Sequence, residues 1–113
     1  MSKAVPSTLF GRRLRAARER AALPQDRLGV LIGLDEGCSS ARISRYETGT
    51  HEPPFAIAAS LAKVLKIPVA YLYCLEDDLA DLILDIGRLT RSKRIVAAKT
   101  IQRIAQMDNS VGL

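Results

Sequence analysis

The sequence predicts an all-α protein that consists of one small domain and a helical extension. The chain has 113 residues, which is enough for one hydrophobic core and too little for two full domains. Apolar residues make up 48% of it, and they recur at the three- and four-residue spacing of amphipathic helices. This composition excludes a disordered chain and most enzyme architectures.

The sequence contains little that could perform chemistry. Cys38 and Cys74 have no neighbouring cysteine, and His51 is the one histidine, so we expect two reduced thiols, no metal site and no cofactor. There is no glycine-rich phosphate loop, which argues against an enzyme. No segment resembles a signal peptide or reaches the roughly 18 apolar residues of a membrane span, so we expect a cytoplasmic protein with no membrane contact.

The first two helices are separated by a proline. Ser7 or Thr8 can cap a helix that runs to about Ala22, with apolar residues on one face and arginines on the others. A second, short helix is expected over residues 25–32, where Gly33 ends it.

A link and a third helix follow. We expect Asp35 to Cys38 to form a loop, with its acidic side chains turned away from a polyanion and with Gly37 allowing a bend. Ser39 is well placed to cap a helix over residues 40–47, which Gly49 stops. After two prolines, residues 55–66 predict a fourth helix, and a single turn follows around Val69 to Leu72.

The C-terminal part has its own pattern, in which acidic residues precede basic ones. A helix is expected from Glu76, and another is expected over residues 92–107. In the second of these helices we expect Ala97, Ile101, Ile104 and Ala105 to be buried. We therefore divide the chain into a domain at 1–75 and a helical extension at 76–113. The predicted dimer interface of the extension is Leu79, Leu82, Ile83, Ile86, Ile101 and Ile104. The alternative is an extension that packs only on its own domain.

All of the net charge of +5 lies in the first part of the chain. Residues 1–75 hold 11 basic and 6 acidic side chains, whereas the remainder holds equal numbers. The basic side chains that cluster are Arg12, Arg13, Arg15, Arg18 and Arg20 in the first helix and Arg42 and Arg45 in the third. A polyanion is the natural partner to test, although charge alone leaves a solvated helix face equally open.

Residues 10–75 resemble the phage repressor and Cro-like (Xre-type) family of helix-turn-helix domains of bacterial transcriptional regulators. The residues that carry the resemblance are Gly11-Arg12-Arg13-Leu14-Arg15, Pro24-Gln25-Asp26-Arg27-Leu28, Gly33-Leu34, Ser39 to Ser44-Arg45-Tyr46-Glu47, Gly49, Pro53 and Leu61-Ala62. The resemblance implies a lambda repressor-like five-helix domain that binds double-stranded DNA, with a C-terminal helical extension of one or two helices. In such domains the third helix enters the major groove.

The resemblance also implies roles for individual residues. The expected base contacts are Ser40, Ala41, Ser44 and Arg45, on the helix face opposite Ile43 and Tyr46. The expected phosphate contacts are Gln25, Arg42, Thr48, Thr50 and His51. Arg18 and Glu47 match the positions of a structural ion pair. Three features depart from the family pattern. Pro24 removes a cap from the second helix, and Gly29 loosens that helix while permitting close packing against the third. The link is also longer than the family's shortest turn, by the residues Asp35 to Cys38.

Two functions fit these features. The first is a sequence-specific transcriptional regulator, a repressor that binds a palindromic operator as a homodimer. The alternative is an antitoxin-type module that binds a toxin through its C-terminal helices and autoregulates its operon.

Overall fold

The structure is a computed structural model that describes residues 6–110, with side chains to Met107, and every regular element among these residues is a helix. The elements are α1 (Leu9–Arg20), α2 (Gln25–Leu31), α3 (Glu36–Thr48), α4 (Phe55–Leu65), the 3-10 helix η1 (Val69–Tyr73), α5 (Asp77–Gly87) and α6 (Arg91–Ser110). The predicted all-α class is confirmed. Residues 1–5 of the predicted domain and residues 111–113 of the predicted extension lie outside the described residues.

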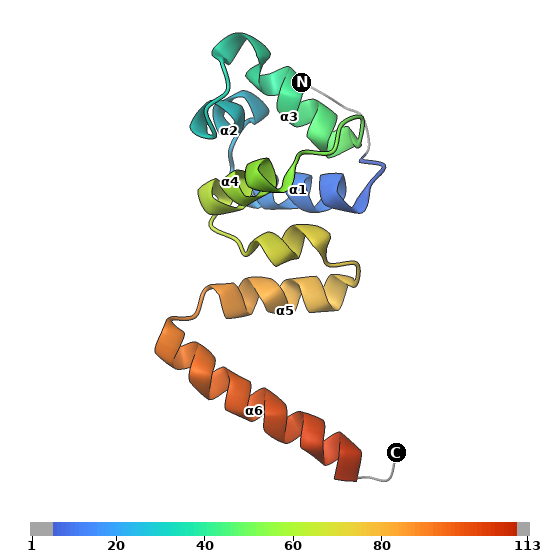
Figure 1. The fold of residues 1–113 in the computed structure, drawn as a ribbon, viewed down its shortest axis with the longest axis vertical. Coiled ribbons are helices and arrows are strands. Elements are labelled where there is room, and N and C mark those ends of the chain that lie inside the picture. Colours follow the sequence, from blue (N-terminus) through green and yellow to red (C-terminus); the bar gives the residue numbers. More distant parts are fainter. Residues whose placement is uncertain (1–5, 111–113) are drawn as a thin grey trace.

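Figure 1 shows α2 and α3 at one end of an elongated molecule and α6 at the other, with α1, α4, η1 and α5 between them. The principal extents of the molecule are 57 × 29 × 23 Å. Side chains from α1 to η1 meet in one core, whose fully buried members include Leu14, Leu28, Ile43, Leu61 and Leu72. No helix within the described residues is long and apolar enough to cross a membrane.

The first helix begins where the sequence predicts and ends slightly earlier. The Thr8 hydroxyl accepts a hydrogen bond from the backbone N–H of Gly11 at 3.0 Å, which caps α1. The helix stops at Arg20 because Ala22 takes a left-handed conformation with φ 56°. The chain then turns through Pro24, which supplies no side-chain cap to α2, as expected.

The link between α2 and α3 differs from the prediction. α3 begins at Glu36 with Asp35 at its N-cap position, so Gly37 lies inside the helix and makes no bend. The turn is made instead by Gly33, whose φ of 99° favours glycine. An acidic side chain in the first turn stabilises a helix N-terminus, which explains why Glu36 is helical rather than part of a loop. The additional residues therefore lengthen α3 instead of the link.

Ser39 is a second correction, because it caps nothing. Its side chain is fully buried between α2 and α3, and its hydroxyl donates to the backbone oxygen of Asp26 at 2.5 Å. A Cβ on Gly29 would lie 1.9 Å from the Ser39 hydroxyl oxygen. The close packing expected at Gly29 is thus confirmed, and it holds the two helices together.

The hydrophobic core continues past Leu75 into α5. Ala80 and Leu84 are buried against η1, and Ile83 is packed on the same core. Leu79 and Leu82 remain 45% and 55% exposed. Of the α5 residues in the predicted dimer interface, Leu79 and Leu82 are thus open to solvent, whereas Ile83 faces the chain's own domain.

Arg13 fastens the start of α5 to α1. Its guanidinium donates to the backbone oxygens of Cys74 at 2.9 Å and Leu75 at 3.2 Å, and it lies 2.9 Å from the Asp77 carboxylate. The Arg13 side chain is itself 9% exposed. Its charge is consequently used inside the molecule and is not available to a polyanion.

α6 is longer than predicted and extends away from the body (Figure 1). The Arg94 guanidinium donates to the backbone oxygens of Ile86 and Gly87, both at 3.2 Å, and so interacts with the C-terminal end of α5. Beyond this point Ile101 and Ile104 are 52% and 55% exposed. α6 reaches past the domain instead of folding back on it, so the expected burial of these two residues in a dimer interface stays a prediction.

Candidate nucleic-acid interface

One face of α3 is open at the end of the molecule opposite α6 (Figure 1). Ser40, Ala41 and Arg45 are exposed on it, and Ser44 is partly exposed. On the other side of the helix Ile43 and Tyr46 are buried in the core. Within the described residues, no hydrogen bond or ion pair holds the Arg45 guanidinium. The structure thus brings the four expected base-contact residues together on a free surface.

A buried cluster behind this face fixes the end of α3. The Glu47 side chain is fully buried, and one of its oxygens lies 2.5 Å from Nε of Arg18. Its other oxygen accepts from Nε of Arg15 at 3.1 Å and from the Gln25 amide at 3.1 Å. A buried carboxylate needs such donors, because an unpaired charge in a core is costly.

Sequence reasoning missed two of these three partners. Arg15 lies three residues before Arg18 on α1, so both reach the same carboxylate, and that spacing was the available signal. Arg13, Arg15 and Arg18 all make contacts inside the molecule, so most of the arginine cluster of α1 is engaged there. On α3 itself, positive charge comes from the exposed Arg45 and the partly buried Arg42.

Gln25 connects the buried cluster to the open face. Its amide N–H donates to Glu47, and its amide oxygen accepts from the Ser40 hydroxyl at 3.3 Å. The Gln25 side chain is buried, so what the structure shows is that it positions Ser40.

The loop after α3 is held in a defined shape. Gly49, in the left-handed region with φ 87°, and His51 both donate backbone N–H groups to the oxygen of Arg45, at 3.1 and 3.2 Å. The hydroxyls of Thr48 and Thr50 lie 3.0 Å apart. Thr50 and His51 are exposed at this edge of the face. The loop offers short polar groups of the type that contacts a phosphate backbone.

The early start of α3 enlarges the candidate surface. Gly37 and Cys38 are exposed in its first turn, and Gly37 lies one helical turn before Ala41. A Cβ on Gly37 would meet nothing within 4 Å. Sequence reasoning placed both residues in a loop, although Asp35 followed by Glu36 is a usual sign of a helix N-terminus.

A short α2, a tight link and an exposed polar and basic face on α3 define the class of this protein. This is the arrangement of a helix-turn-helix domain. Comparison with known families and structures agrees. The model of a family described as a helix-turn-helix domain matches residues 9–72, more than half of the chain.

A crystal structure described as that of the transcriptional regulator BswR is similar to this one with a TM-score of 0.78 and 45% sequence identity. The match covers 82% of this chain and 92% of the other. No curated protein matches this chain. The chain belongs to the helix-turn-helix family of DNA-binding domains, which confirms the resemblance to repressor and Cro-like domains.

Proposed function

We propose that the protein is a sequence-specific transcriptional regulator, a repressor that binds a palindromic operator as a homodimer. The observation that carries the proposal is the open face of α3, with an unengaged Arg45 and a Ser40 positioned by Gln25. The similarity to a solved transcriptional regulator supports it.

In this proposal the open face of α3 reads base edges. Arg45 donates two hydrogen bonds to a guanine, an interaction that contributes about 1 to 3 kcal/mol of discrimination. Ser40 and Ser44 donate or accept hydrogen bonds, and the methyl group of Ala41 contacts a thymine. The groups assigned to phosphate are Gln25 at the start of α2, Arg42, Thr48, Thr50 and His51.

The exposed apolar residues of α5 and α6 support dimerisation. Leu79 and Leu82 on α5, together with Ile101 and Ile104 on α6, are each about half exposed, and such residues mark interaction surfaces when they lie together. Acidic residues accompany the apolar ones on α5, and basic residues accompany them on α6. We propose that α6 of one copy packs on α5 of another, because opposite charges then flank the apolar contact.

The test is selection of genomic DNA fragments by the purified protein at about 150 mM salt, followed by sequencing of the retained fragments. Nonspecific electrostatic binding falls steeply at this salt concentration, whereas base reading persists. An enriched palindrome with half-sites about one helical turn apart is the expected result. Retention without any shared sequence would contradict the proposal.

One observation favours a second candidate function. α6 reaches away from the domain (Figure 1), and apolar side chains are exposed along it, as an antitoxin-type module would need for binding a toxin. In that case α6 wraps a partner protein, and DNA binding serves to autoregulate the operon. Co-expression with the product of the adjacent gene distinguishes the two, because a stable complex formed through α6 supports the antitoxin and its absence supports the homodimeric regulator.

A further inference from the structure

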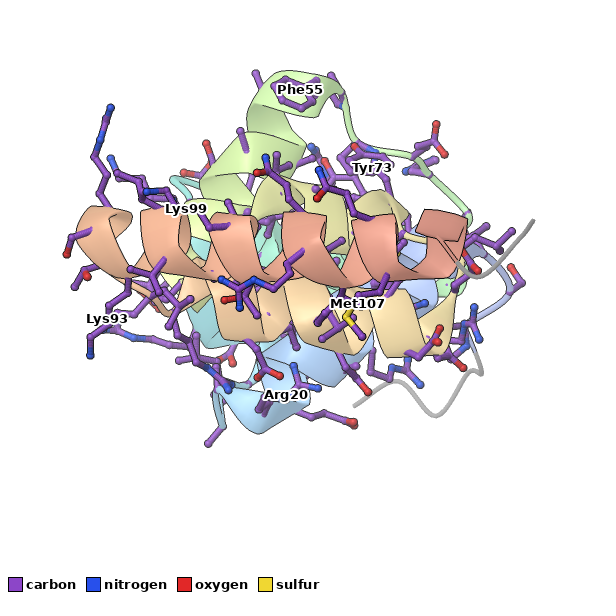
Figure 2. All side chains as sticks on the ribbon, turned by 90° about the horizontal axis from the view of Figure 1, so that it is seen from below. Arg20, Phe55, Tyr73, Lys93, Lys99 and Met107 are labelled. Carbon is purple, nitrogen blue, oxygen red and sulfur yellow. The ribbon has the colours of Figure 1, made fainter. Side chains whose placement is uncertain are left out.

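A pocket of about 630 Å³ is lined by residues of α1, α2, α4 and α5 and of the segments that follow them, and by none of α3. It is formed where α1, α2, α4 and α5 end, and Arg20 on its wall lies on the opposite side of the molecule from Phe55 in Figure 2. Small-molecule sites in proteins have volumes of about 300 to 1,000 Å³. The pocket is therefore large enough for a small organic ligand.

The wall of the pocket is mainly apolar. Leu23, Val64 and Ile67 line it from the segments that follow or end α1 and α4, and Leu84 lines it from α5. Leu31, the last residue of α2, is 43% exposed at the same place, although a leucine on a packed domain is usually covered. These side chains favour a ligand with an apolar body.

Three cations and no carboxylate line the same pocket. Arg88 pairs with Asp85 at 3.4 Å, and Arg20 lies over the ring of Tyr71, with 5.9 Å from its guanidinium carbon to the ring centre. The Lys66 ammonium has no ion pair or hydrogen bond with any residue that the structure describes. Positive charge around an apolar cavity is complementary to one anionic group on the ligand.

The backbone of Lys66 has a conformation that is unfavourable for residues other than glycine. Its φ of 58° lies in the left-handed region, where helix ends normally carry glycine. A lysine at this position projects a side chain from the end of α4 where glycine would leave none.

We propose that this pocket binds a small organic acid with an apolar body, held by Lys66 and Arg20 at its carboxylate. The pocket wall includes Leu31 at the end of α2, the helix that packs on α3, and Leu84 of α5, the helix that leads to α6. An occupant thus contacts one element that packs on α3 and one element that leads to α6. The site is accordingly placed to act as an effector site.

The experiment is isothermal titration calorimetry of the full chain with decanoate, below the concentration at which it forms micelles, and with decanol as the uncharged match. We expect saturable binding of one decanoate per chain and weaker binding of decanol, because only the acid uses the cations. Equal binding of both, or no saturable binding, would overturn the proposal. The measurement involves no DNA, so its failure is distinguishable from failure of the proposed regulator function.

Variants locate the site. Lys66→Gln and Lys66→Gly are both expected to weaken decanoate binding by about tenfold, the loss of one charge-assisted hydrogen bond, and the glycine variant also suits the left-handed backbone. Lys63→Gln, on the same helix but outside the pocket, is the matched control and should bind normally. Ala21→Trp should block the pocket from its exposed wall. Unchanged binding in the Lys66 and Ala21 variants would show that decanoate binds elsewhere.

Discussion

The Glu47 carboxylate shows how single residues set up the DNA-reading surface. It accepts from two arginines of α1 and from the amide of Gln25, which in turn holds the Ser40 hydroxyl. A charge buried at 0% exposure thereby fixes both the end of α3 and one side chain on its open face. Such a charge contributes less to net stability than to orientation, because desolvation offsets much of its attraction.

Removing one partner of this buried cluster should nevertheless be costly. In Arg18→Met, Glu47 keeps Arg15 and Gln25 but loses the closest of its donors, so we expect a decrease of about 3 kcal/mol in the free energy of unfolding, measured by urea denaturation. Arg88→Met breaks an ion pair whose side chains are 65% and 70% exposed and should cost less than about 0.5 kcal/mol. Equal effects of the two substitutions would show that the Glu47 cluster is not a buried charge network.

Arg45 offers the sharpest test of base reading. We expect Arg45→Ala to abolish the preference for the selected operator over random DNA, while salt-sensitive nonspecific binding survives, as measured by fluorescence anisotropy at several salt concentrations. Arg42→Ala should instead weaken operator and random DNA alike, because a phosphate contact carries no sequence information. Equal losses on both DNAs for Arg45→Ala would remove it from the base-reading role.

At the scale of elements, the identity of the helices could be predicted but the start of α3 could not. Helical spacing of apolar residues predicts each α-helix that the structure describes and the turn at η1, and in α1 to α4 the predicted apolar face is the one that packs on the core. Ser39 looked like a cap, because serine at an N-cap and serine in a tight helix contact are indistinguishable without the neighbouring helix. The buried Ser39 and the partner Gly29 are set by tertiary packing that a local pattern does not contain.

A pair of glycines tests this account of α2 and α3. Gly29→Ala places a Cβ 1.9 Å from the Ser39 hydroxyl, so we expect it to cost about 1 to 3 kcal/mol of unfolding free energy. Gly37→Ala meets open space within a helix and should add about 0.5 kcal/mol, because alanine loses less conformational freedom than glycine. Thermal denaturation followed by circular dichroism measures both. A destabilising Gly37→Ala would favour a bend at this residue over the helix that the structure shows.

At the scale of the whole molecule, the candidate DNA interface on α3 and the long helix α6 lie at opposite ends (Figure 1). Arg13 and Arg94 are the polar links along this length, the first joining α1 to α5 and the second joining α5 to α6. α6 itself lies across the molecule with Lys93 and Met107 towards its two ends in Figure 2. The sequence could predict the apolar residues of the extension but not their direction, because an amphipathic helix packs equally well on its own domain or on another chain.

The proposed dimer makes a prediction for the intact chain. The wild type should have twice the chain mass of 12.3 kDa by light scattering after size exclusion. The double variant Leu82→Glu and Ile104→Glu should be a monomer, because two buried carboxylates would have to be desolvated at the interface. It should stay helical, since the side of α5 that carries Ala80 and Leu84 is untouched. Gln102→Glu, which adds a charge to α6 at a polar position, should remain a dimer, and a dimeric double variant would place the interface elsewhere.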